Sequence, residues 1–394
     1  MRILYAITTV PFPPEAGVHI RELAIGRLLR TCGRVTLLSV VGGGHAAAIE
    51  QARAAFDDVI AVEWRDREVE RHGLAARLDG FGKQLWPGYF GQKLPPEQCE
   101  FFRRVAREHD LVWFHTLAIT NCFNVRSMGR SVVDMDDLVY RKLELNARIA
   151  PTMGRRLWRT WGALKWRLHE MKAHRRFGIA CVCSEADKLH LGGQPRIHVV
   201  PNGFTMPAAE PIWRPRTCKR LGFIGTLGYH PNNDAIRWFR DTIWPRIVRE
   251  EPGVQFRIVG RLLFSKDSPP LNHPGFDLLG YLDDPADEIA TWSAMVVPLR
   301  VGGGTRIKII EAFSRKCPVV STAIGAYGIE ATNGRHLILA DRPEDFADAC
   351  LHLIRQPAAA PMVEEAWKLF LANYTWDAIG ARVERAVEDC LKIG

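Results

Sequence analysis

Residues 294–313 read AMVVPLRVGGGTRIKIIEAF, and three patterns follow one another within this stretch. The apolar run Ala294–Val297 predicts a buried strand, and the glycines after it predict a loop. From about Thr305 to Phe313 the apolar spacing predicts a helix. A strand, a glycine-rich loop and a helix in this order indicate a phosphate-binding loop.

The residue types in this loop suit a diphosphate with a sugar diol beside it. Gly302, Gly303 and Gly304 let the backbone approach an anion closely, and Thr305 opens a helix whose first N–H groups are free donors. Arg306 and Lys308 oppose the helix dipole unless an anion lies between them and the backbone. Glu311, one turn later, offers a carboxylate acceptor for a sugar diol. A plain tight turn with a solvated arginine and lysine is the alternative.

Outward from this loop, short aliphatic runs alternate with helical patterns along the whole chain, which is the rhythm of parallel α/β sheets. The expected strands are 3–7, 35–40, 59–62, 111–114, 132–133, 179–182 and 197–200, then 221–224, 255–259, 277–279, 294–297 and 318–321. Helices are expected at 20–29, 233–248 and 305–313. The rhythm stops and restarts once, so the sequence predicts two Rossmann-like, doubly wound domains.

The 394 residues suffice for two or three domains, and a proline-rich stretch separates the two halves. We expect an acceptor-binding domain at 1–200, a hinge at 201–216, a donor-binding domain at 217–372 and a terminal helix at 373–394 that packs back on the first domain. Ligands should bind in a cleft at the carboxyl ends of both sheets.

Charge is distributed unevenly along the chain. The sequence has 53 Lys and Arg against 44 Asp and Glu, and residues 1–200 hold 30 basic and 21 acidic side chains, whereas residues 201–394 hold 23 of each. A basic first half predicts an anionic partner: nucleic acid, a membrane surface or a phosphorylated substrate. The nine cysteines form no framework, which predicts reduced thiols in a cytoplasmic protein. No apolar run is long enough to span a bilayer, so any membrane contact should be peripheral.

The segment 154–177 carries eight basic residues and one acidic residue. Leu157, Trp161, Leu164, Leu168 and Met171 recur at helical spacing, which predicts an amphipathic helix with this stripe facing the core. Trp158 and Trp166 lie off the stripe. Basic residues with such tryptophans predict binding to an anionic membrane surface, with a solvated helix as the alternative.

The glycine-rich motif and several others are similar to those of family-four glycosyltransferases. The resemblance rests on residues 302–313, 318–322, 325–329, 13–17, 199–203, 223–226, 230–235 and 374–376 and extends over nearly the whole chain. It implies the two-domain GT-B fold, retaining chemistry, and transfer of a sugar from a UDP- or GDP-linked donor to a glycan or lipid-linked acceptor. The leaving diphosphate would take the acceptor proton while Arg306 and Lys308 stabilise its charge.

The resemblance also implies roles for single residues. His115, expected at the carboxyl end of its strand, would lie beside the transferred sugar. Gly225 and Thr226 would bind the donor, and Tyr281 would lie near its base. On the opposite side of the cleft, Gly17 would let backbone amides reach the ligand.

Two positions depart from the family pattern. Gly303 stands where the family commonly has the first of two glutamates, so backbone N–H groups should replace a side-chain contact to the sugar. Many members place an Arg and a Lys after the first strand of the second domain, where this chain has Thr226–His230. Neutralisation of the diphosphate should therefore depend more heavily on Arg306 and Lys308.

No resident cofactor or metal is expected. Asp134 and Asp136 match a D-x-D pattern that holds a metal in another glycosyltransferase fold, but two Rossmann-like halves argue against that fold, and Asp134 is expected to orient an acceptor or a loop. Two other functions stay open. One is a nucleotide-sugar epimerase of the same fold. The other is a nucleic-acid-binding or nucleic-acid-modifying protein, although the sequence shows no recognisable base-reading module.

Overall fold

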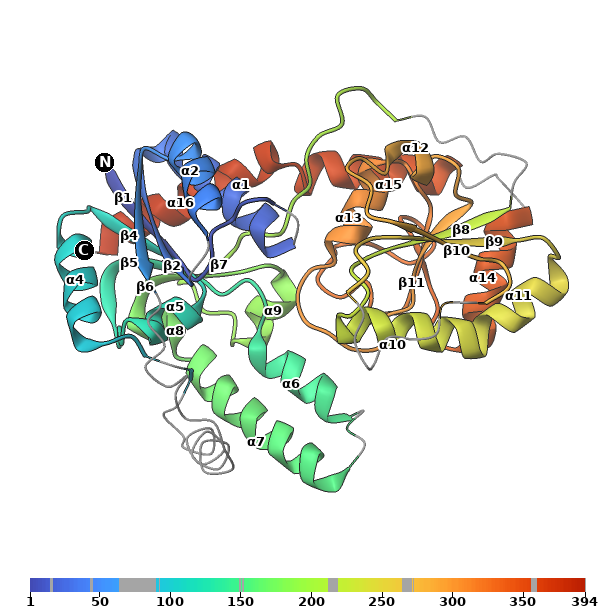
Figure 1. Cartoon of the computed structure of the whole chain (residues 1–394), viewed down its shortest axis with the longest axis horizontal. Helices are drawn as coiled ribbons and strands as arrows, with labels where there is room; N and C mark the ends of the chain where they lie inside the picture. Colours follow the sequence, from blue (N-terminus) through green and yellow to red (C-terminus); the bar gives the residue numbers. More distant parts are fainter. Residues whose placement is uncertain are drawn as a thin grey trace. The chain divides into compact units, whose positions relative to one another are not determined.

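A computed structural model of the chain describes residues 1–14, 17–42, 45–63, 90–91, 93–148, 150, 152–211, 219–263, 271, 273–355 and 360–393. The chain divides into two compact units, which are Met1–Pro201 with Ile379–Gly394 and Asn202–Ala378 (Figure 1). We call them unit 1 and unit 2. Each is built around one parallel β-sheet with helices packed on it.

Unit 1 contains a seven-stranded sheet in the order β3-β2-β1-β4-β5-β6-β7. Its strands are β1 (Arg2–Ile7), β2 (Arg34–Val41), β3 (Asp58–Glu63), β4 (Leu111–His115), β5 (Met128–Asp134), β6 (Phe177–Val182) and β7 (Ile197–Val199). Its helices are α1 (Gly17–Cys32), α2 (Ala46–Ala55), α4 (Pro96–Arg107), α5 (Leu117–Cys122), α6 (Val139–Arg148), α7 (Met153–Glu170), α8 (Ala173–Arg176) and α9 (Glu185–His190). The central strands β4 and β6 are buried along their whole length, as expected for a sheet covered on both faces.

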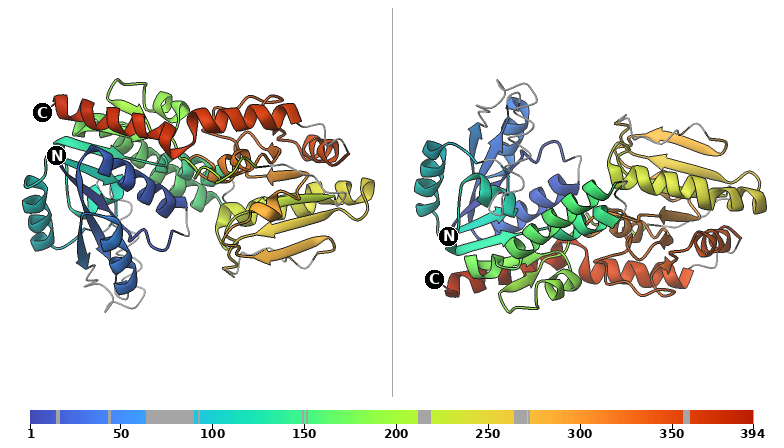
Figure 2. Two further views of the ribbon diagram at one scale, coloured as in Figure 1. Left: turned by 90° about the horizontal axis from the view of Figure 1, so that it is seen from above. Right: turned by 90° about the horizontal axis from the view of Figure 1, so that it is seen from below.

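The carboxyl-terminal helix α16 (Trp376–Ile393) joins unit 1 from Ile379 onward. It runs along the sheet of that unit (Figure 2), and the Cys390 thiol lies 4.0 Å from the Gly129 carbonyl oxygen. A Cβ on Gly380 would lie 3.3 Å from the Leu28 side chain of α1, so a small residue suits this close approach.

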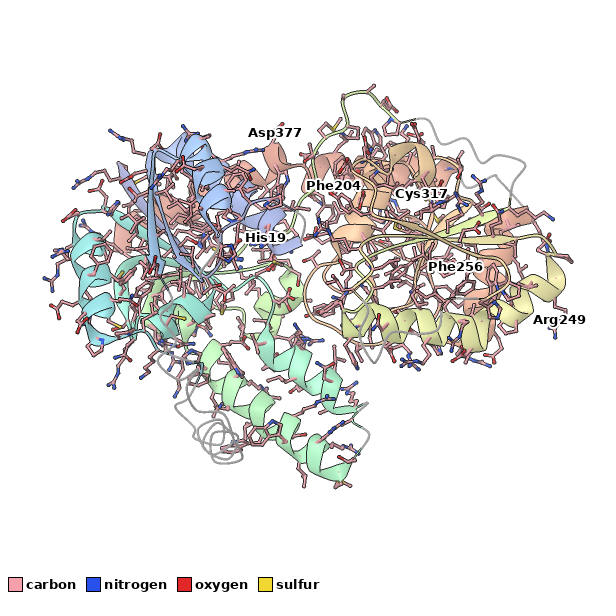
Figure 3. All side chains as sticks on the ribbon, in the orientation of Figure 1. His19, Phe204, Arg249, Phe256, Cys317 and Asp377 are labelled. Carbon is pink, nitrogen blue, oxygen red and sulfur yellow. The ribbon has the colours of Figure 1, made fainter. Side chains whose placement is uncertain are left out.

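Unit 2 contains a six-stranded sheet in the order β10-β9-β8-β11-β12-β13. Its strands are β8 (Arg220–Ile224), β9 (Gln255–Val259), β10 (Phe276–Gly280), β11 (Ala294–Val297), β12 (Val319–Ser321) and β13 (Ile338–Leu339). Its helices are α10 (His230–Trp238), α11 (Trp244–Glu250), α12 (Ala286–Ile289), α13 (Ile307–Ser314), α14 (Pro343–Arg355) and α15 (Ala360–Asn373). Figure 3 shows Phe256 among the side chains that fill the interior, whereas Arg249 points away from it.

The helix expected over 233–248 is instead α10 and α11 joined by a π-helical turn at Phe239–Ile243. Pro245 explains the difference. Proline has no N–H and its ring clashes with the carbonyl four residues earlier, so the turn before it widens.

The orientation predicted for the basic helix is wrong. On α7 the stripe that includes Leu157, Leu164 and Leu168 is solvent-exposed, and the buried side chains are Ala163, Lys165 and Glu170. Periodicity shows which residues share a face, but the partner decides which face turns inward. Here α6 and α7 pack side by side (Figure 1) through the face that does not carry the stripe.

The proline-rich stretch is described only in part. Its residues 202–211 belong to unit 2. There the N–H of Phe204 donates to the carbonyl of Tyr374 at 2.9 Å. Residues 212–218 lie outside the described ranges. The eight cysteines within those ranges are free thiols, and none of the described helices is long and apolar enough to cross a membrane.

Candidate active site

In unit 2 the predicted donor residues lie at one edge of the sheet, where the parallel strands end. Gly225 follows β8, and its N–H donates to the carbonyl of Val259 at the end of β9 at 2.9 Å. The N–H of Gly260 then donates to Gly280, the last residue of β10, at 2.8 Å. The turns after β8, β9 and β10 are therefore held next to one another at the carboxyl edge, where open α/β sheets bind ligands.

The glycine-rich loop follows β11 at the same edge. Gly302 and Gly304 have φ angles of 118° and 72°, which lie in the left-handed region that favours glycine. The helix begins at Ile307 and not at Thr305 as predicted. Arg306 is its N-cap in the extended conformation usual at that position, and its guanidinium folds back and donates to the carbonyl of Gly303.

Polar groups at the start of α13 are available for a ligand. The hydroxyl of Thr305 is buried without a hydrogen-bond partner among the described residues, and no described side chain caps the amino end of this helix. Buried polar groups and helix-start N–H groups normally find partners. An anion at this position would supply them together with the favourable end of the helix dipole.

Lys308 is the link between α13 and the turn after β8. Its Nζ donates to Oδ1 of Asn232 at 3.1 Å and lies 4.0 Å from the centre of the Phe223 ring, while Nδ2 of Asn232 donates to the carbonyl of Thr226 at 2.8 Å. A Cβ on Gly225 would lie 2.7 Å from Nδ2 of Asn232. The structure thus brings Gly225, Thr226 and Lys308 together.

Asn232 and Phe223 belong to this site, but sequence reasoning did not select them. Both lie in segments that carry the family resemblance, 230–235 and 223–226, and that was the available signal. What could not be seen was their contact with Lys308, which lies more than seventy positions further along the chain.

Electrostatics at the site favour a bound anion. Burial, assisted by the neighbouring Arg306 charge, lowers the pKa of Lys308 to about 7. Burial likewise raises the pKa of Glu311 to about 7, although Arg315 opposes that rise. An anion beside Lys308 would restore its ammonium form, and donor hydroxyls beside Glu311 would favour its carboxylate.

Tyr281 follows β10, with β9 between that strand and β8. Its side chain is 50% exposed, and the guanidinium of Arg261 lies 5.1 Å from the centre of its ring. The ring and the cation form a flat, accessible platform at the same edge of the sheet.

In unit 1, His115 is the last residue of β4 and is 2% exposed. Its Nε2 lies 3.7 Å from Oε1 of Glu22 and its Nδ1 lies 3.5 Å from Oδ2 of Asp134, both longer than a normal hydrogen bond. Burial opposes protonation of the imidazole, but the two carboxylates outweigh it and raise the pKa of His115.

Asp134 is held by Arg21 of α1, and both side chains are fully buried. Nε and one terminal nitrogen of Arg21 donate to the two oxygens of Asp134 at 3.0 and 2.8 Å, and the guanidinium also donates to the carbonyls of Val200 and Pro201. Burial alone would raise the pKa of Asp134, but the Arg21 charge holds it below its ordinary value. Both oxygens of this D-x-D aspartate are therefore bound by a guanidinium. Within the described ranges, no three His, Cys, Asp or Glu side chains are arranged to hold a metal.

The predicted Gly17 is the first residue of α1, and residues 15 and 16 before it lie outside the described ranges. From the same helix, Arg21 binds Asp134 and Glu22 lies beside His115. The Nδ1 atom of His19 (Figure 3) lies 3.3 Å from the carbonyl oxygen of Pro13. Glu22 was missed by sequence reasoning, since a lone glutamate in an amphipathic helix gives no signal of burial.

Comparison with known proteins adds a family assignment for one segment. Residues 218–356 match the family model of glycosyl transferases group 1. A curated relative, an uncharacterised 44.6 kDa protein in the cps region of Klebsiella pneumoniae, is 24% identical over 181 residues, which are 42% of this chain. The match spans about half of that relative's length, 46%.

Solved structures resemble the whole chain. Sucrose-phosphate synthase from Thermosynechococcus elongatus has a TM-score of 0.69 at 12% identity over 98% of both chains. HepE of Anabaena in complex with UDP-glucose has a TM-score of 0.64 at 15% identity, over 98% of this chain and 99% of its own. WaaG, a glycosyltransferase involved in lipopolysaccharide biosynthesis, has a TM-score of 0.59 at 13% identity over 98% of both chains. At these identities the likeness concerns the fold.

These findings confirm the predicted family and fold class. The family match favours glycosyl transfer over the epimerase and the nucleic-acid alternatives. Two parallel α/β units and the structural likeness over 98% of the chain agree with the predicted two-domain architecture. The chain has the GT-B fold, and its residues 218–356 match the glycosyl transferases of group 1.

Proposed function

We propose that this chain is a retaining hexosyltransferase that moves a sugar from a nucleoside diphosphate sugar to a glycan or lipid-linked acceptor. The observation that carries the proposal is the start of α13. There a glycine-rich loop, a buried hydroxyl that has no hydrogen-bond partner in the described part of the chain, and two basic side chains lie at the carboxyl edge of the sheet.

The donor is bound by unit 2. Its diphosphate lies against the loop Gly302–Thr305 and the first N–H groups of α13, with Lys308 and Arg306 supplying positive charge. Glu311 accepts hydrogen bonds from the ribose, and Tyr281 stacks near the base. UDP is the first nucleotide to test, because HepE has been crystallised with UDP and UDP-glucose.

Catalysis in this proposal depends on charge stabilisation. As the bond between the anomeric carbon and the diphosphate oxygen breaks, negative charge grows on the diphosphate, and the cations beside it bind more strongly. The acceptor oxygen bonds to the same face of the anomeric carbon, and its proton passes to the leaving phosphate. His115 contacts the transferred sugar, while Glu22 and Asp134, the latter held by Arg21, set the charge around the imidazole. This chemistry uses no metal, because Arg306, Lys308 and the helix start supply the charge.

The descriptions of related proteins support a glycan or lipid-linked acceptor. The Klebsiella relative is described as lying in a cps region, and WaaG is described as acting in lipopolysaccharide biosynthesis. We therefore propose that the chain acts in the assembly of a cell-surface polysaccharide, at its cytoplasmic stage.

Thermal melting with a panel of nucleoside diphosphates tests the donor assignment. A ligand at one hundred times its Kd stabilises the fold by about 2.7 kcal/mol, so one member of the panel should raise Tm by several degrees. The matching sugar donor and an acceptor preparation should then give a product whose anomeric configuration, read by NMR, equals that of the donor. If no nucleoside diphosphate raises Tm at millimolar concentration, the donor assignment is wrong. An inverted product would overturn retention alone.

A further inference from the structure

The exposed face of α7 carries a row of apolar side chains to which the proposed function assigns no role. Six apolar side chains spaced three or four residues apart form a continuous row along this helix and its C-cap, and we call it the α7 stripe. It consists of Met153, Leu157, Trp161, Leu164, Leu168 and Met171, with exposed fractions of 66, 64, 37, 49, 53 and 37%. A surface helix of a soluble domain normally turns such a row toward the core.

The row faces outward because the inward face of α7 has its own partner. Glu170 is 1% exposed, and its two carboxylate oxygens accept the N–H groups of Val139 and Tyr140, the first residues of α6, at 2.7 and 3.1 Å. These two hydrogen bonds connect the end of α7 to the start of α6 and fix the rotation of α7 about its axis. The α7 stripe is therefore exposed because α7 packs against α6 through its other face.

Basic side chains flank the α7 stripe. Arg156, Arg167, Lys172 and Arg175 are all exposed. Glu170 is the single acidic residue of the segment 154–177, and it is buried in the contact with α6. Within the segment 154–177, the surface that α7 presents is therefore apolar along its row and cationic at its margins.

Two hollows of 340 and 290 Å³ open beside the α7 stripe, and both are lined by Phe90, Trp161 and Lys165. Trp158 and Trp166 line the larger one. Indole rings and lysine stems combine an apolar body with a polar end, which suits the boundary between headgroups and acyl chains.

We propose that α7 is a docking surface for an anionic lipid bilayer. The helix lies in the plane of the interface, the α7 stripe enters the acyl boundary, and the flanking cations contact lipid phosphates. Charge complementarity selects this occupant. A second copy of the chain would place the same cationic margins against each other, which is unfavourable. The surface belongs to unit 1 and is independent of the donor site in unit 2.

Sedimentation with vesicles tests the proposal. We compare vesicles of phosphatidylcholine alone with vesicles in which roughly a third of the lipid is phosphatidylglycerol. The wild-type chain should sediment with the anionic vesicles at low salt and at least tenfold less with the neutral ones. Replacing Leu157, Leu164 and Leu168 together by Ser should weaken binding at least tenfold. Replacing Arg156, Arg167 and Lys172 by Gln should abolish the preference for anionic lipid.

Control variants at other exposed positions show whether loss of vesicle binding is specific to the α7 stripe or follows from any change of the surface. Leu189→Ser changes an apolar side chain that is 72% exposed on α9, and Arg335→Gln removes a cation that is 64% exposed in unit 2, so neither should alter vesicle binding. Every variant should keep the melting shift given by a nucleoside diphosphate, which reports an intact unit 2.

Three results would overturn the proposal. The first is a wild-type chain that does not bind anionic vesicles at low salt. The second is a loss of binding in the control variants as large as that in the stripe variant. The third is a dimer in sedimentation velocity that dissociates when the stripe is substituted. Loss of the nucleotide melting shift with vesicle binding intact would contradict the donor site alone.

Discussion

Lys308 should make nucleotide affinity depend on pH in one direction above neutrality. In the free protein its pKa is lowered from 10.5 to about 7, chiefly by burial. A diphosphate beside Nζ favours the ammonium form, so the bound protein keeps the proton to much higher pH. Above about pH 7 the free protein must take up a proton in order to bind, and affinity should fall as pH rises.

The size of the effect follows from the shift. Each pH unit above the pKa of the free protein costs about 1.4 kcal/mol, so Kd should rise tenfold per unit and about 100-fold by roughly pH 9. The window above about pH 7.5 isolates Lys308, because a terminal phosphate with a pKa near 6 is already ionised there. Glu311, with a pKa of about 7, is also mainly ionised in that window.

Calorimetric titration of a nucleoside diphosphate measures both Kd and the protons taken up. In two buffers with different ionisation enthalpies, close to one proton should be absorbed per ligand at about pH 8.5. Lys308→Arg keeps its charge and should flatten the pH dependence. Lys368→Arg changes a lysine that is 69% exposed in the same unit and should leave the dependence intact. A wild-type Kd that stays constant across this window would refute the placement of the diphosphate beside Lys308.

Three further predictions concern the rest of the molecule. Asp134→Asn removes the fully buried carboxylate that pairs with Arg21, leaving Asp136 at 3.7 Å as the nearby carboxylate, and should lower the free energy of unfolding by about 3 kcal/mol in chemical denaturation. Because the folded pKa of Asp134 lies below 3.8, the wild-type contribution is present above that pH and lost as the pH falls toward the folded pKa, and the variant should lack this acid limb. Glu170→Ala removes the acceptor of two buried N–H groups at the start of α6 and should cost about 1–3 kcal/mol, whereas Glu144→Ala on the exposed side of α6 should cost under about 0.5 kcal/mol. Transfer activity should survive EDTA, and loss of activity that manganese or magnesium restores would assign a metal role to Asp134.

The sequence was sufficient to predict the sheet architecture, because each buried parallel strand is a short apolar run bounded by turn residues. The expected strands at 255–259 and 294–297 coincide with β9 and β11. The glycine-rich loop was also readable, since left-handed φ angles at Gly302 and Gly304 require the residue type that stands there. The short strand β13 gave no pattern, because its two residues are paired only through β12.

Tertiary contacts decided what the sequence could not. The rotation of α7 depends on Glu170 reaching α6, and helical spacing alone cannot show which face has a partner. The position of Lys308 depends on Asn232, which a different helix supplies. Near His115, the Arg21 guanidinium can be buried because Asp134 and two backbone carbonyls accept its hydrogen bonds. These partners come from distant parts of the chain.

The most direct test of the donor site is calorimetric titration of the cognate nucleoside diphosphate into the Glu311→Gln and Arg306→Ala variants. Loss of a hydrogen bond to a charged group costs about 1.5–3 kcal/mol, so Glu311→Gln should raise Kd by about one to two orders of magnitude while Tm stays unchanged. Arg306→Ala should raise Kd and also slow the chemical step, because its interaction strengthens as charge builds on the diphosphate. Glu344→Gln, on a side chain that is 59% exposed on α14, should bind as wild type does. Unchanged dissociation constants in both site variants would contradict the assignment of the Gly302–Thr305 loop and α13 as the donor site.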